Sequence, residues 1–98
     1  MPYIKSSERV ALDNKIDTLV HEIKLLGGIE QDYAGRLNYV CTRLAIGLMG
    51  EIKYWKVALY CGVFSNVMSE FYRRAATPYE DKKIKENGDV PGYDSNCI

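Results

Sequence analysis

The chain has 98 residues, and 13 Lys and Arg balance 13 Asp and Glu, so the formal net charge is zero. This length fits one domain. The balanced charge argues against a whole-protein field that attracts a DNA or RNA duplex, while a local basic patch stays compatible with it. Eight tyrosines against two phenylalanines favour half-buried positions, which are typical of oligomer interfaces and ligand pockets.

The cysteines Cys41, Cys61 and Cys97 are odd in number and far apart, and His21 is the only histidine. These spacings fit neither a zinc site nor a disulfide framework. The N-terminus lacks the apolar stretch of a signal peptide, and no run reaches eighteen apolar residues. We therefore predict a cytoplasmic protein with three reduced thiols, no metal, no cofactor and no membrane contact.

The chain begins with an extended segment at 2–5. The first apolar stripe with helical spacing predicts a helix over 13–26, preceded at most by a short turn from residue 7. Gly27-Gly28 ends this helix, because glycine tolerates the left-handed conformation that follows a helix. A linker is predicted over 27–35. A second stripe then predicts a helix over 35–49.

The longest predicted helix covers 52–76 and is apolar on nearly all sides, which is typical of a helix that is buried on nearly all sides. The two shorter helices supply too little cover for it. We therefore expect a homo-oligomer that is formed through this helix. Ala58 and Gly62 are small and one turn apart, so they would let two helices approach closely.

Thr77-Pro78-Tyr79-Glu80 has the pattern of a capping box, with proline at the first helical position. This pattern predicts a fourth helix over 78–87, ended by Asn87-Gly88. The predicted fold class is all-α, with three to four helices in a small oligomerising bundle. Residues 1–90 would form a single helical domain, and 91–98 an irregular tail.

The main candidate binding cluster is Tyr72, Arg73, Arg74, Tyr79 and Lys83. Arginine forks and aromatic faces together suit phosphate and base recognition. A kink at Pro78 would fold the fourth helix back toward the two arginines. The structural alternative is an i, i+4 ion pair between Glu70 and Arg74, with the arginines at a helix end.

Three further residues, Asn38, Arg43 and Asn87, are candidates for polar contacts with the same ligand. Asn38 and Arg43 do not share one clean helical face, so a joint site needs another element. The alternative is that they form hydrogen bonds across a bundle. His21 is interpreted as structural or solvent-facing.

Four acidic residues near the C-terminus could be proposed as Mg²⁺ ligands: Glu80, Asp81, Glu86 and Asp89. The comparison would be with the all-α nucleotide pyrophosphohydrolases, which use a Glu-x-x-Glu pair on one helix. No Glu-x-x-Glu occurs in this chain. A magnesium-dependent nucleotide hydrolase is therefore kept only as a second alternative.

Several motifs resemble those of a family of small uncharacterised proteins from phages and microbes: Met-Pro-Tyr-Ile at the start, Leu37-Asn38-Tyr39, Glu70-Phe71-Tyr72-Arg73-Arg74, Pro78-Tyr79-Glu80-Asp81, and Lys83-Ile84-x-Glu86-Asn87-Gly88-Asp89-Val90. The resemblance covers most of residues 1–90. Pro91 stands where an aromatic residue would be expected. The family label implies no activity.

In size and style the chain is also similar to the anti-CBASS sponges, small oligomeric phage proteins that sequester the cyclic oligonucleotide signals of bacterial immunity. This similarity is one of fold style alone. We accordingly expect a non-enzymatic oligomer that sequesters a phosphate-bearing ligand, such as a cyclic dinucleotide. The alternative from another class is a structural or protein-interaction module without a ligand.

Overall fold

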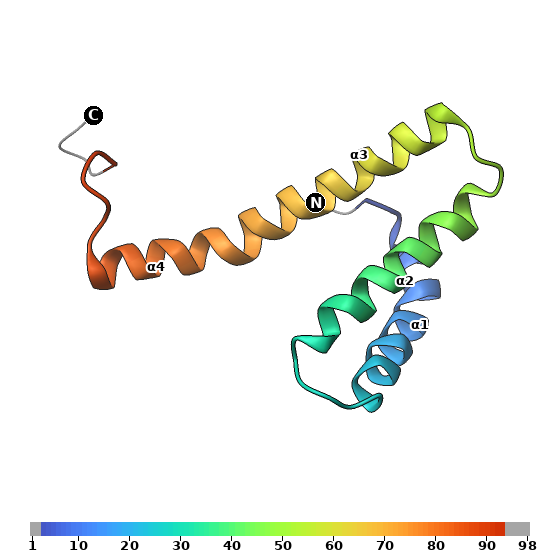
Figure 1. The fold of residues 1–98 in the computed structure, drawn as a ribbon, viewed down its shortest axis with the longest axis horizontal. Helices are drawn as coiled ribbons and strands as arrows, with labels where there is room; N and C mark the ends of the chain where they lie inside the picture. Colours follow the sequence, from blue (N-terminus) through green and yellow to red (C-terminus); the bar gives the residue numbers. More distant parts are fainter. Residues whose placement is uncertain (1–2, 94–98) are drawn as a thin grey trace. The chain divides into compact units, whose positions relative to one another are not determined.

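The computed structural model describes residues 3–93, and every regular element among them is helical (Figure 1). The all-α prediction is therefore confirmed. The chain divides into two units, one up to Gly50 and one from Glu51 onwards.

The N-terminal unit is a hairpin of two helices, α1 (Ser6–Leu25) and α2 (Asp32–Met49), which lie side by side (Figure 1). The start of α1 was predicted seven residues too late. The apolar stripe begins at Ile16, but the preceding Glu, Arg, Ala and Leu residues are good helix formers without a stripe. The start of α2 was predicted three residues too late, because the carboxylate of Asp32 accepts a hydrogen bond from the Ile29 N–H (3.0 Å) and shortens the linker.

The C-terminal unit is one continuous helical run from Tyr54 to Asn87, 34 residues long (Figure 1). It consists of α3 (Tyr54–Phe71), a π-helical segment η1 (Tyr72–Ala76) and α4 (Thr77–Asn87). The run ends at Gly88, whose positive φ of 83° with a ψ of 161° is a backbone conformation that glycine adopts readily. The end at Asn87-Gly88 was predicted correctly, and the predicted start of α3 at residue 52 was two residues early.

The predicted break before Pro78 was wrong. Thr77 has helical backbone angles (φ −60°, ψ −48°), and no side chain caps the start of α4. The capping box therefore does not form in this structure. A capping box at Thr77 would start a new helix, whereas α3 can simply continue. Continuing an already formed helix adds a hydrogen bond for each residue fixed, and this is the arrangement observed.

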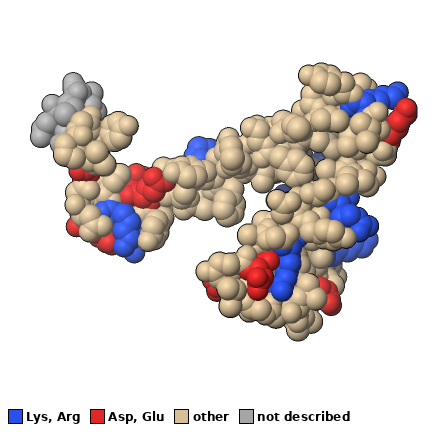
Figure 2. Space-filling model, viewed as in Figure 1, with Lys and Arg blue, Asp and Glu red and all other residues tan. Residues whose placement is uncertain are grey.

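Among residues 3–93 none is buried, and large apolar side chains lie exposed along α3. In Figure 2 the α3 part of the long helix is mostly free of charged side chains, whereas blue and red groups gather toward α4. The described helices include none that is long and apolar enough to cross a membrane.

Candidate functional site

The η1 segment, called the π turn below, is the local feature that positions the main candidate cluster. The N–H of Thr77 donates to the carbonyl of Tyr72, five residues back instead of four. Proline at position 78 has no N–H, and its ring collides with the carbonyl four residues earlier in a regular α-helix. A wider turn moves that carbonyl aside, so the helix continues through Pro78. Such single π turns are frequent at functional sites.

Glu70 lies at the end of α3 and binds both arginines of the cluster. Arg73 Nη2 donates to both carboxylate oxygens at 2.8 Å, and Arg74 Nε donates to Oε1 at 2.7 Å. The hydrogen bond from Arg73 is the largest influence on the pKa of Glu70, and with Arg74 it lowers this pKa although desolvation acts to raise it. The predicted Glu70–Arg74 pair is confirmed, and Arg73 joins it.

Tyr72 is paired with Glu80 on the other side of the π turn. Hydrogen bonding to the Glu80 carboxylate, and then its negative charge, raise the pKa of the Tyr72 hydroxyl. Residues eight apart lie about 80° apart around a regular α-helix, whereas residues seven apart share a face. Because the π turn contains one extra residue, Tyr72 and Glu80 align as residues seven apart would.

Tyr79, Lys83 and Asn87 follow one another at four-residue steps on α4. The Lys83 Nζ lies 5.6 Å from the centroid of the Tyr79 ring, and it also donates to Glu86 at 3.0 Å. Asn87 is the last residue of α4. Tyr79 is 61% exposed, so its ring is accessible for stacking.

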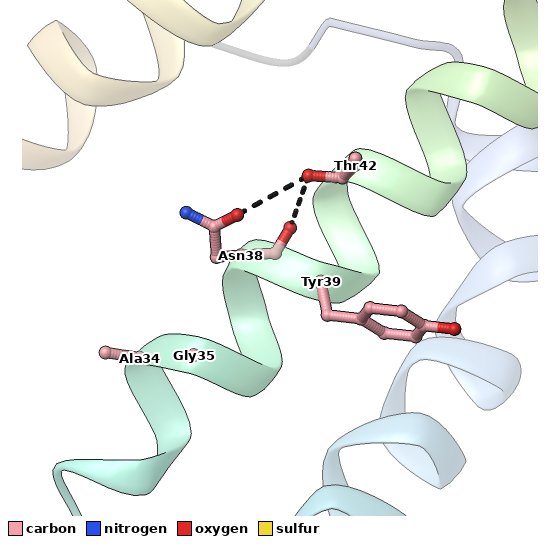
Figure 3. A pocket seen from close by; sticks show the side chains of 5 residues that line it. All are labelled: Ala34, Gly35, Asn38, Tyr39 and Thr42. Carbon is pink, nitrogen blue, oxygen red and sulfur yellow. Dashed lines mark hydrogen bonds between the residues drawn. The ribbon is translucent and has the colours of Figure 1, made fainter.

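Asn38 and Arg43 belong to the N-terminal unit, on α2. The Arg43 guanidinium donates to the Tyr39 hydroxyl (2.9 Å) and lies 5.8 Å from that ring. Asn38 lines a shallow hollow with Ala34, Gly35, Tyr39 and Thr42 (Figure 3). The Thr42 hydroxyl bonds to the Asn38 carbonyl (2.8 Å), and the Tyr39 ring points away from the Asn38 amide (Figure 3).

The structure thus gathers Tyr72, Arg73 and Arg74 on the π turn and places Tyr79, Lys83 and Asn87 on the next turns of the same helical run. It leaves Asn38 and Arg43 in the other unit. The predicted fold-back of the last helix toward the arginines does not occur, since the run continues through Pro78 without a break.

Three of the four acidic residues of this region have local partners. Glu80 is engaged by Tyr72, Glu86 by Lys83, and the Asp89 carboxylate accepts from the Val90 N–H (2.7 Å). Within residues 3–93, no three His, Cys, Asp or Glu side chains come together as a metal-binding group. Cys97 lies outside the described residues.

One organising residue was missed by sequence reasoning. Arg36 on α2 reaches back to the end of α1, where Nη1 donates to the carbonyls of Gly27 (2.7 Å) and Ile23 (3.2 Å). The last carbonyls of a helix lack partners within it. The sequence shows only a cation nine residues after Gly27, and no spacing rule assigns that cation to these carbonyls.

Of the comparisons with known proteins, the one with family models finds a match. The family described as "Domain of unknown function (DUF6899)" matches residues 1–90. The chain belongs to this family. No curated protein and no solved structure matches it. The family match carries no catalytic assignment, and the division into a domain over 1–90 and a tail over 91–98 stays a prediction.

Proposed function

We propose that this member of the DUF6899 family is a self-assembling helical binding protein, in which α3 forms the contact between copies. The observation that carries the proposal is the exposure of α3. Trp55 is 62% exposed, Leu59 54% and Phe71 73%. Exposed apolar patches of this kind mark interaction surfaces.

The apolar character extends around the whole helix. The eight residues from Val57 to Phe64 contain no charged side chain, and eight residues make more than two full turns. A helical hairpin such as α1–α2 covers at most one side of a helix, so the remaining side needs cover from another chain. A second copy offers the same apolar helix, and an ideal Cβ on Gly62 would meet nothing within 4 Å.

The free energy at stake is comparable with the stability of a whole domain. Nine large apolar side chains of α3 are exposed: Tyr54, Trp55, Val57, Leu59, Val63, Phe64, Val67, Met68 and Phe71. Burying the exposed half of each contributes about 1 kcal/mol, or roughly 9 kcal/mol per chain as an upper estimate. Domains are stable by only about 5–15 kcal/mol. Assembly would therefore decide whether the chain is folded.

Light scattering and thermal melting test the assembly. The wild type should be an oligomer whose melting temperature rises with protein concentration. The double variant Leu59→Asp, Val63→Asp should be monomeric and melt without cooperativity. Asn14→Asp, which adds a charge at an exposed position of α1, should keep both properties. A wild-type monomer with a concentration-independent, cooperative melt would overturn the proposal.

We further propose that the assembled protein sequesters a phosphate-bearing small molecule of the cyclic dinucleotide class, in the manner of a phage anti-defence sponge. The supporting observation is that two guanidinium groups, an accessible ring and a lysine follow one another on one helical run. Arg73 and Arg74 would bind phosphate oxygens, Tyr72 or Tyr79 would stack on a base, and Lys83 would add charge. Asn87 on the same helical run would supply a polar contact. A role for Asn38 and Arg43 stays a prediction. That the C-terminal motif is shared with phage proteins is likewise proposed.

Calorimetry with a panel of cyclic dinucleotides tests the ligand. The double variant Arg73→Ala, Arg74→Ala should lose binding while its mass by light scattering stays that of the wild type. Lys15→Ala, Lys24→Ala removes the same charge from α1 and should bind normally. No binding by the wild type would favour the alternative, a structural module without a ligand.

A further inference from the structure

The cluster of Glu70, Arg73 and Arg74 carries one net positive charge. Its three hydrogen bonds, at 2.7 to 2.8 Å, are charge-assisted and hold both guanidinium groups around one carboxylate. Glu70 is the least exposed member, with 26% of its side chain accessible, against 66% for Arg73 and 59% for Arg74. The carboxylate is therefore a fixed part of the cluster, with the guanidinium groups outside it.

Two neighbouring charges modify this field. Lys83 is paired with Glu86 at 3.0 Å, which weakens its positive contribution, and Glu80 places a negative charge beside Tyr72. An anion that docks at the two arginines is thus met by the single net charge of the cluster and, close by, by the Glu70 carboxylate.

Arg74 shows how an anion can be added without displacing Glu70. Only its Nε is used by the carboxylate, and its two Nη groups make no hydrogen bond within residues 3–93. A guanidinium group has five N–H donors in a fixed plane. One edge can bind Glu70 while the other edge binds a phosphate oxygen.

We propose that Glu70 is a specificity-determining residue, which makes this site accept a singly charged phosphodiester and reject a doubly charged phosphomonoester. The inference rests on the proposed ligand function. A phosphodiester carries one negative charge, which the cluster balances. A phosphomonoester carries close to two at neutral pH. Its second charge would lie unbalanced next to the Glu70 carboxylate, where like charges repel.

The test uses two probes that differ by one hydrolysed bond, cyclic di-GMP and its linear form pGpG, which ends in a phosphomonoester. Calorimetry at one ionic strength gives the ratio of their dissociation constants. The wild type should prefer the cyclic probe by about tenfold. Glu70→Gln, which keeps the shape and removes the charge, should lower that preference at least fivefold, mainly by tighter binding of pGpG.

Glu22→Gln on α1 removes a carboxylate far along the sequence and should keep the wild-type preference. Glu70→Ala gives a second measurement if Glu70→Gln loses its helical circular dichroism. Equal preference in the wild type and both Glu70 variants would overturn the role of Glu70 and leave the ligand function standing. Binding of neither probe by any of these proteins would overturn the ligand proposal together with this inference.

Discussion

The two units use their polar side chains in different ways. In the α1–α2 hairpin, Arg36 joins residues that are nine and thirteen positions away along the sequence. In the α3–α4 run, the side-chain hydrogen bonds of Glu70 and Glu86 connect residues three or four positions apart. Arg36 therefore fixes the corner of the hairpin across its loop. The bonds named for the long helix are local and its large apolar side chains are exposed, which is why we propose that a second copy covers them.

Arg36→Ala should have the largest effect, and it tests whether Arg36 stabilises the hairpin across its loop. The change removes two charge-assisted hydrogen bonds to helix-terminal carbonyls, and we expect a loss of about 2–3 kcal/mol in the stability of the hairpin. Hydrogen exchange of the α1 and α2 amides measures it. Arg43→Ala is the matched control, since within residues 3–93 its guanidinium bonds to Tyr39 on its own helix alone, and it should cost under about 0.5 kcal/mol. Equal losses would contradict the capping role of Arg36.

Pro78→Ala tests the π turn in the other unit. An alanine restores the missing N–H and lets the run form regular α-helical turns, so the run should become more stable by about 2 kcal/mol. Chemical denaturation of the wild type and the variant at one protein concentration measures the change. Thr77→Ala should be neutral within about 0.5 kcal/mol, because Thr77 caps nothing. A loss of about 1 kcal/mol of stability in Thr77→Ala would show that Thr77 does cap α4.

Two glycines form the corner between α1 and α2, and alanine substitutions there test its backbone geometry. Gly27 and Gly28 both have positive φ, at 76° and 86°. A Cβ on Gly28 would collide with Asp32 Oδ2, whereas a Cβ on Gly27 meets nothing within 4 Å. Both alanine variants should be less stable by about 1 kcal/mol, because alanine at positive φ is strained. Gly28→Ala should lose about 1 kcal/mol of stability more, because of the collision with Asp32. Thermal melts of the two variants side by side measure the difference.

The smallest effect is a pH dependence from the long helix. The pKa of Glu70 is lowered by its arginine partners, so its contribution to stability is present above the ordinary carboxyl pKa and is lost as the pH falls through the lowered value. The pKa of Tyr72 is raised by Glu80, so its contribution is present below the ordinary phenol pKa and disappears as the pH rises through the raised value. Melting temperatures of wild type, Glu70→Gln and Tyr72→Phe across both ranges measure the two contributions; unchanged profiles in the variants would contradict them.

The same contrast explains what the sequence could predict. The Glu70–Arg74 pair, the stop at Gly88 and the all-round apolar stretch of α3 depend on spacings within a few residues, so they were found. Arg36 was missed because its partners are backbone carbonyls across a loop, which no spacing rule specifies. The break before Pro78 was predicted wrongly because a local proline rule was applied to a helix that can widen by one residue.

The π turn also limits how a partner helix could pack along the long helix. One extra residue in a turn shifts the angular phase of everything after it by about 100° relative to an unbroken α-helix. A straight partner helix that follows a stripe along α3 therefore leaves that stripe when it reaches α4. The helical run therefore has two surfaces that face different directions, the apolar stripe of α3 and the surface of α4. Substitutions near the arginines can change ligand binding without changing the apolar stripe.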